Sequence, residues 1–227
     1  MSGFKDKNIN AKIKIANIDM IIDFVFYCLE EMKNDFKEQH KKIPNHEEKI
    51  RNCLLNNYLK NNDVRKNNDF SDMFVLFEPE VPENYQESSY IYVGRVDIKV
   101  IGYESFTKKD AYNIIECKRI DGTLNLNKKY VNEGIKRFVS DKKYSVYNLQ
   151  NIMLGFVVED IDINENSQII DSIQKEDTQI IIENFKKSSR TNKNEYLYKG
   201  IYNVDNNKYT LWNMFFLLYE IIEKGES

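Results

Sequence analysis

The spacing of apolar residues changes from helix-like to strand-like along this chain, and that order constrains its fold more than any other feature. Repeats of three and four residues predict helices over 17–39, 46–61, 127–144 and 166–185. Strand-like patterns cover 72–82, 88–103, 112–120, 151–160 and 195–204, while 211–224 is an apolar helix or a strand that turns into one. Strand–helix–strand connections favour an α/β fold with a mixed sheet flanked by helices.

Capping and turn residues indicate where several elements begin and end. Asn17 or Asp19 can cap the first helix, and Asn45 can cap the second. We expect prolines to end the strand over 72–82, and the Asn-rich segment 61–71 to be a loop. The sequence shows no internal repeat and no long linker, so we expect residues 1–227 to form a single domain.

Composition excludes several classes of protein. The chain is 41% hydrophobic and 30% charged, which is typical of a globular protein and not of a disordered one. Its net charge of −3 predicts that any binding to phosphate comes from a local patch, because the molecule as a whole is not basic. We find no signal peptide and no apolar run of membrane length, so we expect no membrane partner.

The cysteines and histidines argue against a zinc site. Cys28, Cys53 and Cys117 are isolated from one another, and neither His40 nor His46 is spaced with a cysteine as zinc ligands are. A disulfide framework is equally unsupported, so a reduced, cytoplasmic location fits best.

An acid and a base lie on the same side of the strand expected over 112–120. Residues two apart in a strand face the same way, so Glu116 and Lys118 share one face while Cys117 points to the other, into the core. We expect Glu116 and Lys118 to project where the sheet opens to solvent. An ion pair on a solvated strand face is the plainer interpretation, but both flanks of this pair are strongly apolar.

A second acid, Asp97, interrupts the apolar pattern of the preceding strand, where aspartate is unfavourable. If the two strands pair, Asp97 and Glu116 converge at one edge, and two such carboxylates repel each other unless a cation lies between them. Oxygen ligands of this kind suit Mg²⁺ or Mn²⁺. Lys118, alongside, can position a water molecule or stabilise the charge that builds on a phosphate.

Asp97, a gap of 18 residues, and the triplet Glu116-Cys117-Lys118 resemble the motif of the PD-(D/E)XK nucleases, the restriction-endonuclease-like superfamily. The resemblance covers about 45–160 and implies an α-β-β-β-α-β core. The first helix and the C-terminal strand or helix would then be additions to that core. Val96 stands where the motif has its proline, a position at which many members of the superfamily vary.

The resemblance implies further site residues on two helices. An acid from the helix before the first core strand often completes the metal site; we prefer Glu47, on the inward stripe of 46–61, and keep Glu48 as the reserve. An acid in a first helical turn is also favoured by the helix dipole alone. The Lys-rich helix after the motif is either a solvated face or a surface that contacts phosphate or nucleic acid through Arg137, Lys129 and Lys136.

These residues together imply an Mg²⁺-dependent hydrolase of phosphodiester bonds. Asp97, Glu116 and Lys118 would be catalytic, and Asp97, Glu116 and Glu47 would hold Mg²⁺ or Mn²⁺. The resemblance implies a DNA endonuclease of the restriction or phage-defence type, which leaves a 5′-phosphate and a 3′-hydroxyl. Cutting both strands of double-stranded DNA requires two sites, so we expect a homodimer.

Two other functions remain as alternatives. The first is a non-catalytic nucleic-acid-binding or assembly subunit with the same fold, which would be free to lose Asp97 or Lys118. The second, an acidic inhibitor or immunity protein, predicts an acidic face and no strand-borne motif.

Overall fold

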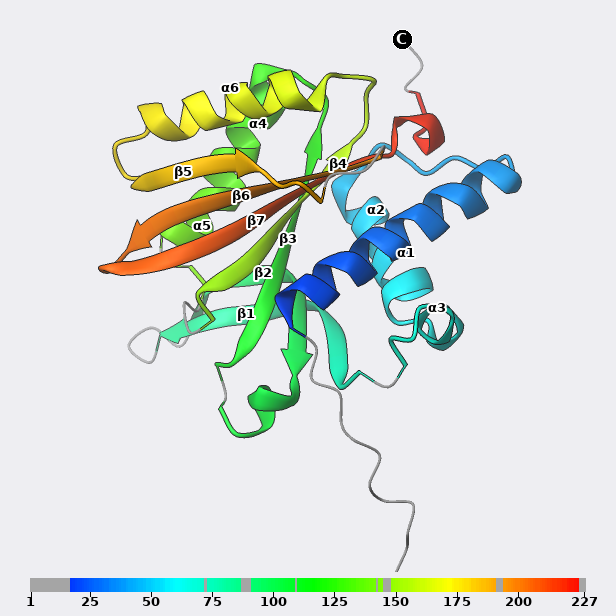
Figure 1. Cartoon of the computed structure of the whole chain (residues 1–227), viewed down its shortest axis with the longest axis horizontal. Coiled ribbons are helices and arrows are strands. Elements are labelled where there is room, and N and C mark those ends of the chain that lie inside the picture. Colours follow the sequence, from blue (N-terminus) through cyan, green and yellow to red (C-terminus); the bar gives the residue numbers. More distant parts are fainter. Residues whose placement is uncertain are drawn as a thin grey trace, which may run out of the picture.

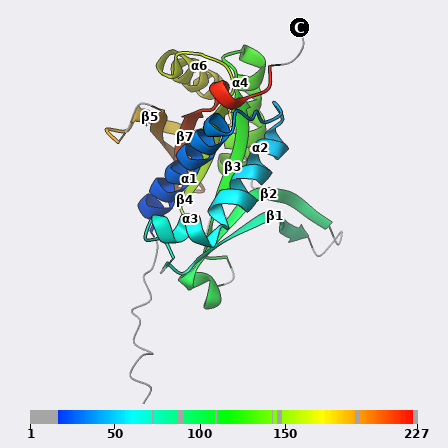
Figure 2. The same cartoon turned by 90° about the vertical axis from the view of Figure 1, so that its right-hand side faces the viewer.

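A single seven-stranded mixed sheet runs through the protein, in the order β1-β2-β3-β4-β7-β6-β5. The structure is a computed structural model and describes residues 17–71, 73–86, 91–108, 110–141, 143–144, 148–190 and 194–224. Figures 1 and 2 show α1, α2 and α3 together on one face of the sheet and α4, α5 and α6 on the other. The expectation of an α/β fold with a mixed sheet flanked by helices is confirmed.

The first face is covered by helices from the start of the described chain. Their bounds are α1 (Ile18–Glu38), α2 (Glu47–Leu54), a π-helical turn (Leu55–Leu59) and α3 (Asn62–Asn67). Asn17 caps α1, because its side chain accepts a hydrogen bond from the backbone N–H of Met20. Asn45 does not cap α2 as expected; its side chain accepts a hydrogen bond from Arg119 instead.

The loop expected over 61–71 is wrong, because α3 lies within it. The side chain of Asn61 accepts hydrogen bonds from the backbone N–H groups of Asp63 and Val64, which satisfies donors that the first turn of a helix leaves open. One asparagine of this Asn-rich segment, Asn61, is therefore the N-terminal cap of a helix.

Three antiparallel strands form one side of the sheet: β1 (Val75–Gln86), β2 (Ile91–Gly102) and β3 (Tyr112–Ile120). Strand β1 does not end at its prolines as expected but continues through Pro79 and Pro82. It lies at the edge of the sheet, which is where a strand tolerates residues that lack a backbone N–H. Strand β3 has the bounds expected from its sequence.

Parallel pairing begins after β3. The chain crosses over through α4 (Leu124–Tyr130), a π-helical turn (Val131–Ile135) and α5 (Lys136–Val139) to reach β4 (Gln150–Val157), which pairs in parallel with β3. The expected helix over 127–144 therefore starts earlier and ends earlier, since the side chain of Thr123 caps its first turn.

The rest of the sheet is built by β5 (Ile182–Lys187), β6 (Glu195–Val204) and β7 (Asn207–Leu217), after helix α6 (Ile163–Glu176). The helix expected over 166–185 is too long, because it includes residues that form β5 at the far edge of the sheet. Of the two readings of 211–224, the strand is correct, and it is followed by a short 3₁₀ turn (Tyr219–Ile221).

Two hydrophobic cores lie on opposite faces of the sheet. One joins α1 and the π-helical turn after α2 to the face of β3 that carries Ile115 and Cys117. The other joins α4, α5 and α6 to the face of β3 that carries Ile114 and Ile120. Both faces of β3 are therefore covered, which decides the surroundings of its charged residues.

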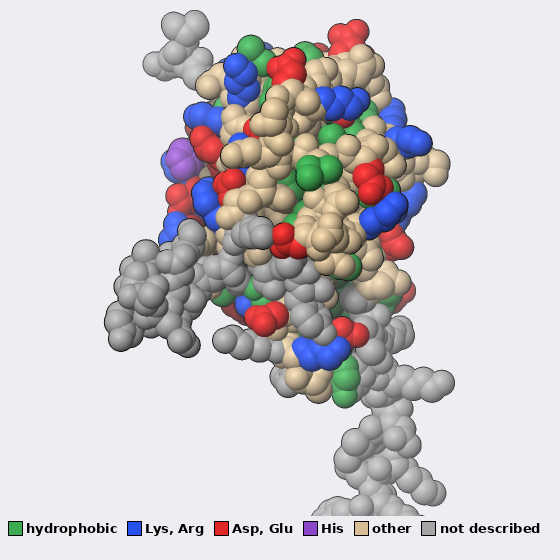
Figure 3. All heavy atoms as spheres, turned by 90° about the vertical axis from the view of Figure 1, so that its left-hand side faces the viewer, with side chains coloured by type: hydrophobic (Ala, Val, Ile, Leu, Met, Phe, Trp, Pro, Cys, Tyr) green, Lys and Arg blue, Asp and Glu red, His purple; other side chains and the backbone are tan. Residues whose placement is uncertain are grey.

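Acidic and basic side chains are interspersed over the face shown in Figure 3. A mixed distribution of this kind gives little net attraction for an anion, in agreement with the net charge of −3. In the described residues, we find no helix that combines the length and the apolar character needed to span a lipid bilayer.

Candidate active site

Asp97 and Glu116 come together because β2 and β3 are antiparallel neighbours. The pairing of these strands runs as far as Ile98 opposite Ile115, so Asp97 and Glu116 are the next residues along. One carboxylate oxygen of Asp97, Oδ2, accepts a hydrogen bond of 2.8 Å from the backbone N–H of Cys117. The side chain of Asp97 thus provides a hydrogen-bond acceptor for β3 just beyond the last backbone pair.

Glu116 is fully buried between the sheet and the helices that follow β3. Its Oε1 accepts hydrogen bonds from Lys118 Nζ at 3.0 Å and from Arg137 Nη1 at 2.7 Å, and its Oε2 accepts one from the Tyr144 hydroxyl at 2.6 Å. Burial and the nearby charge of Asp97 raise the pKa of Glu116 to about 7, although these three donors oppose the rise.

The expectation that Glu116 and Lys118 face solvent is therefore wrong. The helical segment between β3 and β4 lies directly over them, and Gly134 in that segment makes this close approach possible. A Cβ atom on Gly134 would lie 2.4 Å from Met153 Cε and 3.6 Å from Lys118 Cγ. Because glycine has no side chain, the helical segment can pack closely against the end of β3 that carries Glu116 and Lys118.

Lys118 holds three oxygen atoms around its ammonium group. Its Nζ donates to Glu47 Oε1 at 3.1 Å, to Glu116 Oε1 at 3.0 Å and to the carbonyl oxygen of Cys117 at 2.9 Å. Burial by itself lowers the pKa of Lys118, but the carboxylates of Glu116, Glu47 and Asp97 together raise it above its usual value. Lys118 is therefore a permanent positive charge and not a base at neutral pH.

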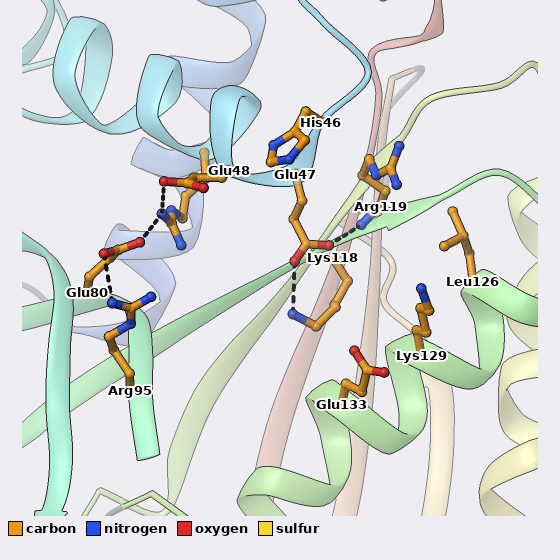
Figure 4. Close-up of a pocket in the computed structure, with 11 residues that line it drawn as sticks. His46, Glu47, Glu48, Glu80, Arg95, Lys118, Arg119, Leu126, Lys129 and Glu133 are labelled. Carbon is orange, nitrogen blue, oxygen red and sulfur yellow. Dashed lines mark hydrogen bonds and ion pairs between the residues drawn. The ribbon is translucent and has the colours of Figure 1, made fainter. Parts of the chain in front are cut away.

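Helix α2 supplies Glu47 from its first turn. Besides Lys118, Glu47 contacts β3 through Oε2, which accepts a hydrogen bond of 3.1 Å from the backbone N–H of Arg119. Figure 4 shows Glu47 reaching down to the strand, while Glu48 lies apart from it. The side chain of Glu48 is 58% exposed, and its Oε1 lies 4.0 Å from Arg51. Of the two candidates, Glu47 is the one that contacts the motif.

Arg51 is a site residue that the sequence interpretation missed. It lies one helical turn after Glu47, is nearly buried, and donates from Nη1 to Asp97 Oδ1 and from Nη2 to Glu80 Oε1, both at 2.6 Å. Residues four apart share a helix face, so the position of Arg51 relative to Glu47 was an available signal.

Tyr144 is the second missed residue, and no local pattern indicates it. Besides donating to Glu116, its hydroxyl accepts a hydrogen bond of 3.0 Å from Arg137 Nη1. Arg137, which the sequence interpretation did select, therefore contacts both members of this buried pair. Tyr144 follows the end of α5, and only the folded chain brings it to Glu116.

Two hollows of about 380 and 490 Å³ lie at the site and share Glu47, Arg95, Lys118 and Glu133 among their lining residues, whereas the buried Glu116 lines neither of them. Of the cations expected to contact phosphate, Lys129 lines the first hollow and Arg137 the second. Lys136 is placed differently. Its Nζ pairs with Asp177 at 2.9 Å and with Gln179 at 2.7 Å.

The donor set can be tested against a divalent cation. Asp97, Glu116 and Glu47 offer only carboxylate oxygens, which suit Mg²⁺ or Mn²⁺, and the repulsion between Asp97 and Glu116 is what a cation would relieve. All six of these oxygens already accept a hydrogen bond from the protein. Within the part of the chain that the structure describes, no three His, Cys, Asp or Glu side chains could hold a metal ion as they stand. The type of donor atom therefore suits Mg²⁺ or Mn²⁺, but in this structure donors of the protein itself occupy all six oxygens.

Comparisons with known proteins give no relative for this chain. No protein-family model, no curated protein and no solved structure matches it.

Proposed function

We propose that this protein is a metal-dependent phosphodiesterase that cleaves nucleic acid, with a restriction-endonuclease-like fold. The observation that carries the proposal is the convergence of Asp97, Glu116, Lys118 and Glu47 from two strands and a helix, with Asp97, Lys118 and Glu47 lining the second hollow. Burying such charges is costly, and apolar residues would stabilise the sheet at least as well. Clusters of buried ionisable groups with shifted pKa values in a cleft are characteristic of functional sites.

The order of elements supports the same class. Helix α2 is followed by the antiparallel strands β1, β2 and β3, then by the helical crossover, and then by β4 parallel to β3. This is the α-β-β-β-α-β order implied by the resemblance in the motif. Helix α1 and the elements after β4 are additions to it.

Each residue has a role that follows from its contacts. Asp97, Glu116 and Glu47 would hold Mg²⁺ or Mn²⁺, which when bound polarises a phosphate and lowers the pKa of a bound water. Lys118 stays protonated and neutralises negative charge that develops on the phosphate. Arg137 orients the carboxylate of Glu116. Lys129 lines the first hollow and Arg95 lines both, and a phosphate backbone would lie along these hollows.

The proposed substrate is double-stranded DNA, cut internally as in restriction or phage defence. A homodimer would supply the two sites that a double-strand cut requires. The free cysteines Cys28, Cys53 and Cys117 suit a reducing cytoplasm.

The second candidate is a non-catalytic subunit that binds nucleic acid or a partner through the same fold. It is favoured by the observation that each carboxylate of the motif is already neutralised by a cation of the protein itself, such as Arg51 at Asp97. In that case the cluster would be a structural ion-pair network.

Calorimetry with Mg²⁺ and a plasmid-nicking assay separate these two functions. Wild type should bind Mg²⁺ and nick the plasmid. Glu116→Gln should lose both, and Lys118→Met should lose nicking while it still binds the metal. Lys175→Ala, which removes a surface pair with Asp171, is the matched control and should behave as wild type. A wild-type protein that neither binds the metal nor cuts DNA or RNA would overturn the nuclease and favour the second candidate.

A further inference from the structure

Helix α2 carries two opposite charges one turn apart, and each is paired with the opposite charge of the motif. Glu47 pairs with Lys118 on β3, and Arg51 pairs with Asp97 on β2. Helix α2 therefore neutralises both Asp97 and Lys118 of the motif. Glu47 can act within the proposed site, whereas the pairing of Arg51 withdraws Asp97 from it.

The contact between Arg51 and Asp97 is close and shielded from water. Arg51 Nη1 lies 2.6 Å from Asp97 Oδ1, and the side chains are only 7% and 16% exposed. The other oxygen of Asp97 is held by the backbone N–H of Cys117. Both oxygens of the carboxylate thus have a donor, and a divalent cation at Asp97 would meet the positive charge of Arg51 at close range.

Glu80 is a second carboxylate partner of Arg51, bonded at the same time as Asp97. It lies on the edge strand β1, and its Oε1 accepts from Arg51 Nη2 at 2.6 Å while its Oε2 lies 3.3 Å from Arg95 Nη1. The side chain of Glu80 is 32% exposed, and its backbone has a φ of +48°, in the left-handed region that residues other than glycine rarely adopt. Arg51 can leave Asp97 and keep its bond to Glu80.

We infer that Arg51 is an internal gate of the metal site, which competes with a divalent cation for Asp97 and is held by Glu80 when the cation binds. The inference rests on the proposed function, because it needs Asp97 to be a metal ligand. In the closed state Arg51 occupies Asp97, and each of the three carboxylates is paired with a cation of the protein. In the open state the Arg51–Glu80 pair remains, and Asp97 is available.

The test is calorimetry of the full chain with MgCl₂ and MnCl₂ at constant ionic strength. Arg51→Met should lower the dissociation constant for the metal by about tenfold or more. In wild type only the fraction of molecules in the open state can bind the metal, and this raises the apparent dissociation constant in inverse proportion to that fraction. Glu80→Gln should bind more weakly than wild type, since it removes the negative charge that holds the released Arg51.

Arg95→Met is the matched control. Arg95 lines both hollows and pairs with Glu80, as Arg51 does, but it has no bond to Asp97. It should change the metal affinity much less than Arg51→Met. Equal gains in the two variants would mean that any positive charge in the cleft repels the metal, and this would overturn the gate.

A second measurement serves if Arg51→Met does not fold. In wild type, the guanidinium N–H signal of Arg51 should shift during a Mg²⁺ titration followed by NMR, while that of Arg65, bonded to the backbone oxygens of Met73 and Val75, should not. Metal binding that leaves the Arg51 signal in place overturns the gate and leaves the proposed function intact. Absence of metal binding in wild type and in every folded variant overturns the proposed function itself.

Discussion

Asp97 accepts a hydrogen bond of 2.8 Å from the backbone N–H of Cys117, at the point where the backbone pairing of β2 with β3 ends. A side chain proposed to hold a metal is thus also part of the sheet. Changes at Asp97 should therefore affect stability as well as function.

Replacing Asp97 with alanine should destabilise the fold by about 3 kcal/mol, because the N–H of Cys117 loses its acceptor and the nearly buried Arg51 loses one of its two close carboxylate partners. Urea unfolding followed by circular dichroism measures this change. Asp63→Ala is the control, since its side chain is 88% exposed and its loss should cost less than about 0.5 kcal/mol. Similar stabilities of the two variants would show that the Asp97 contacts contribute little.

Glu116 should make the stability of the protein depend on pH. Its pKa is raised from 4.5 to about 7 in the folded state, so the folded protein holds this proton more tightly than the unfolded chain does. The contribution of Glu116 to stability is therefore largest below about pH 4.5 and is lost as the pH rises through about 7.

Glu116→Gln isolates this effect, because glutamine imitates the protonated acid. As the pH rises from about 4.5 to about 7, the free energy of unfolding of wild type relative to this variant should fall by up to about 3 kcal/mol. Denaturant unfolding at several pH values gives the difference. A difference that rises with pH would mean that Glu116 is stabilised in its charged form.

Removing the hydroxyl of Tyr144 should impair the site more than the fold. Tyr144→Phe takes a donor from Glu116 and an acceptor from Arg137, so the nicking rate should fall by about tenfold or more while the fold loses about 1–3 kcal/mol. Tyr209→Phe makes the same chemical change at a buried hydroxyl bonded to Asn151, away from the cleft. It should lose similar stability and keep its nicking rate.

Glu47 and Glu48 form a natural pair for mutation, because they are adjacent, chemically identical and differently placed. Glu47→Gln removes a charge that holds Lys118 and should abolish Mg²⁺-dependent nicking. Glu48→Gln, at an exposed side chain, should leave the rate within about a factor of two. Equal losses in a nicking assay would exclude the special role of Glu47.

Gly155 should tolerate no side chain. A Cβ atom there would lie 2.5 Å from Cδ1 of the buried ring of Phe215 in the neighbouring strand, so Gly155→Ala should destabilise the protein by about 1–3 kcal/mol. Gly102→Ala is the control at the end of β2, where a Cβ atom would have nothing within 4 Å. Thermal unfolding compares the two, and equal melting temperatures would contradict the packing of β4 against β7.

Sequence patterns located most elements but not all of their limits. The apolar period of α1 and the β-branched run of β3 are strong local signals, and both elements form where they were expected. Strand β5 was missed because the isoleucines at 180–182, where the strand begins, continue the helical pattern of α6, and only pairing with β6 makes the segment a strand.

The candidate site divides in the same way. The alternation of a strand places Glu116 and Lys118 on one face, and Asp97 stands out as an acid within an apolar strand. The partners of Arg51 and Tyr144, which are Asp97 and Glu116, lie 46 and 28 residues away along the chain. Arg51 had a local signal in its place one turn after Glu47, whereas Tyr144 had none.

The sequence by itself determined the α/β class, the bounds of β3 and the pair of residues that its alternation brings to one side. Those features depend on the spacing of apolar and polar residues along short stretches of the chain, and that spacing is local information. Only the tertiary structure decided that Glu116 is buried, that Glu47 rather than Glu48 contacts Lys118, and that Arg51 holds Asp97. These facts depend on how α2 and the crossover helices lie against the sheet, and that placement is set by packing between segments distant in the chain.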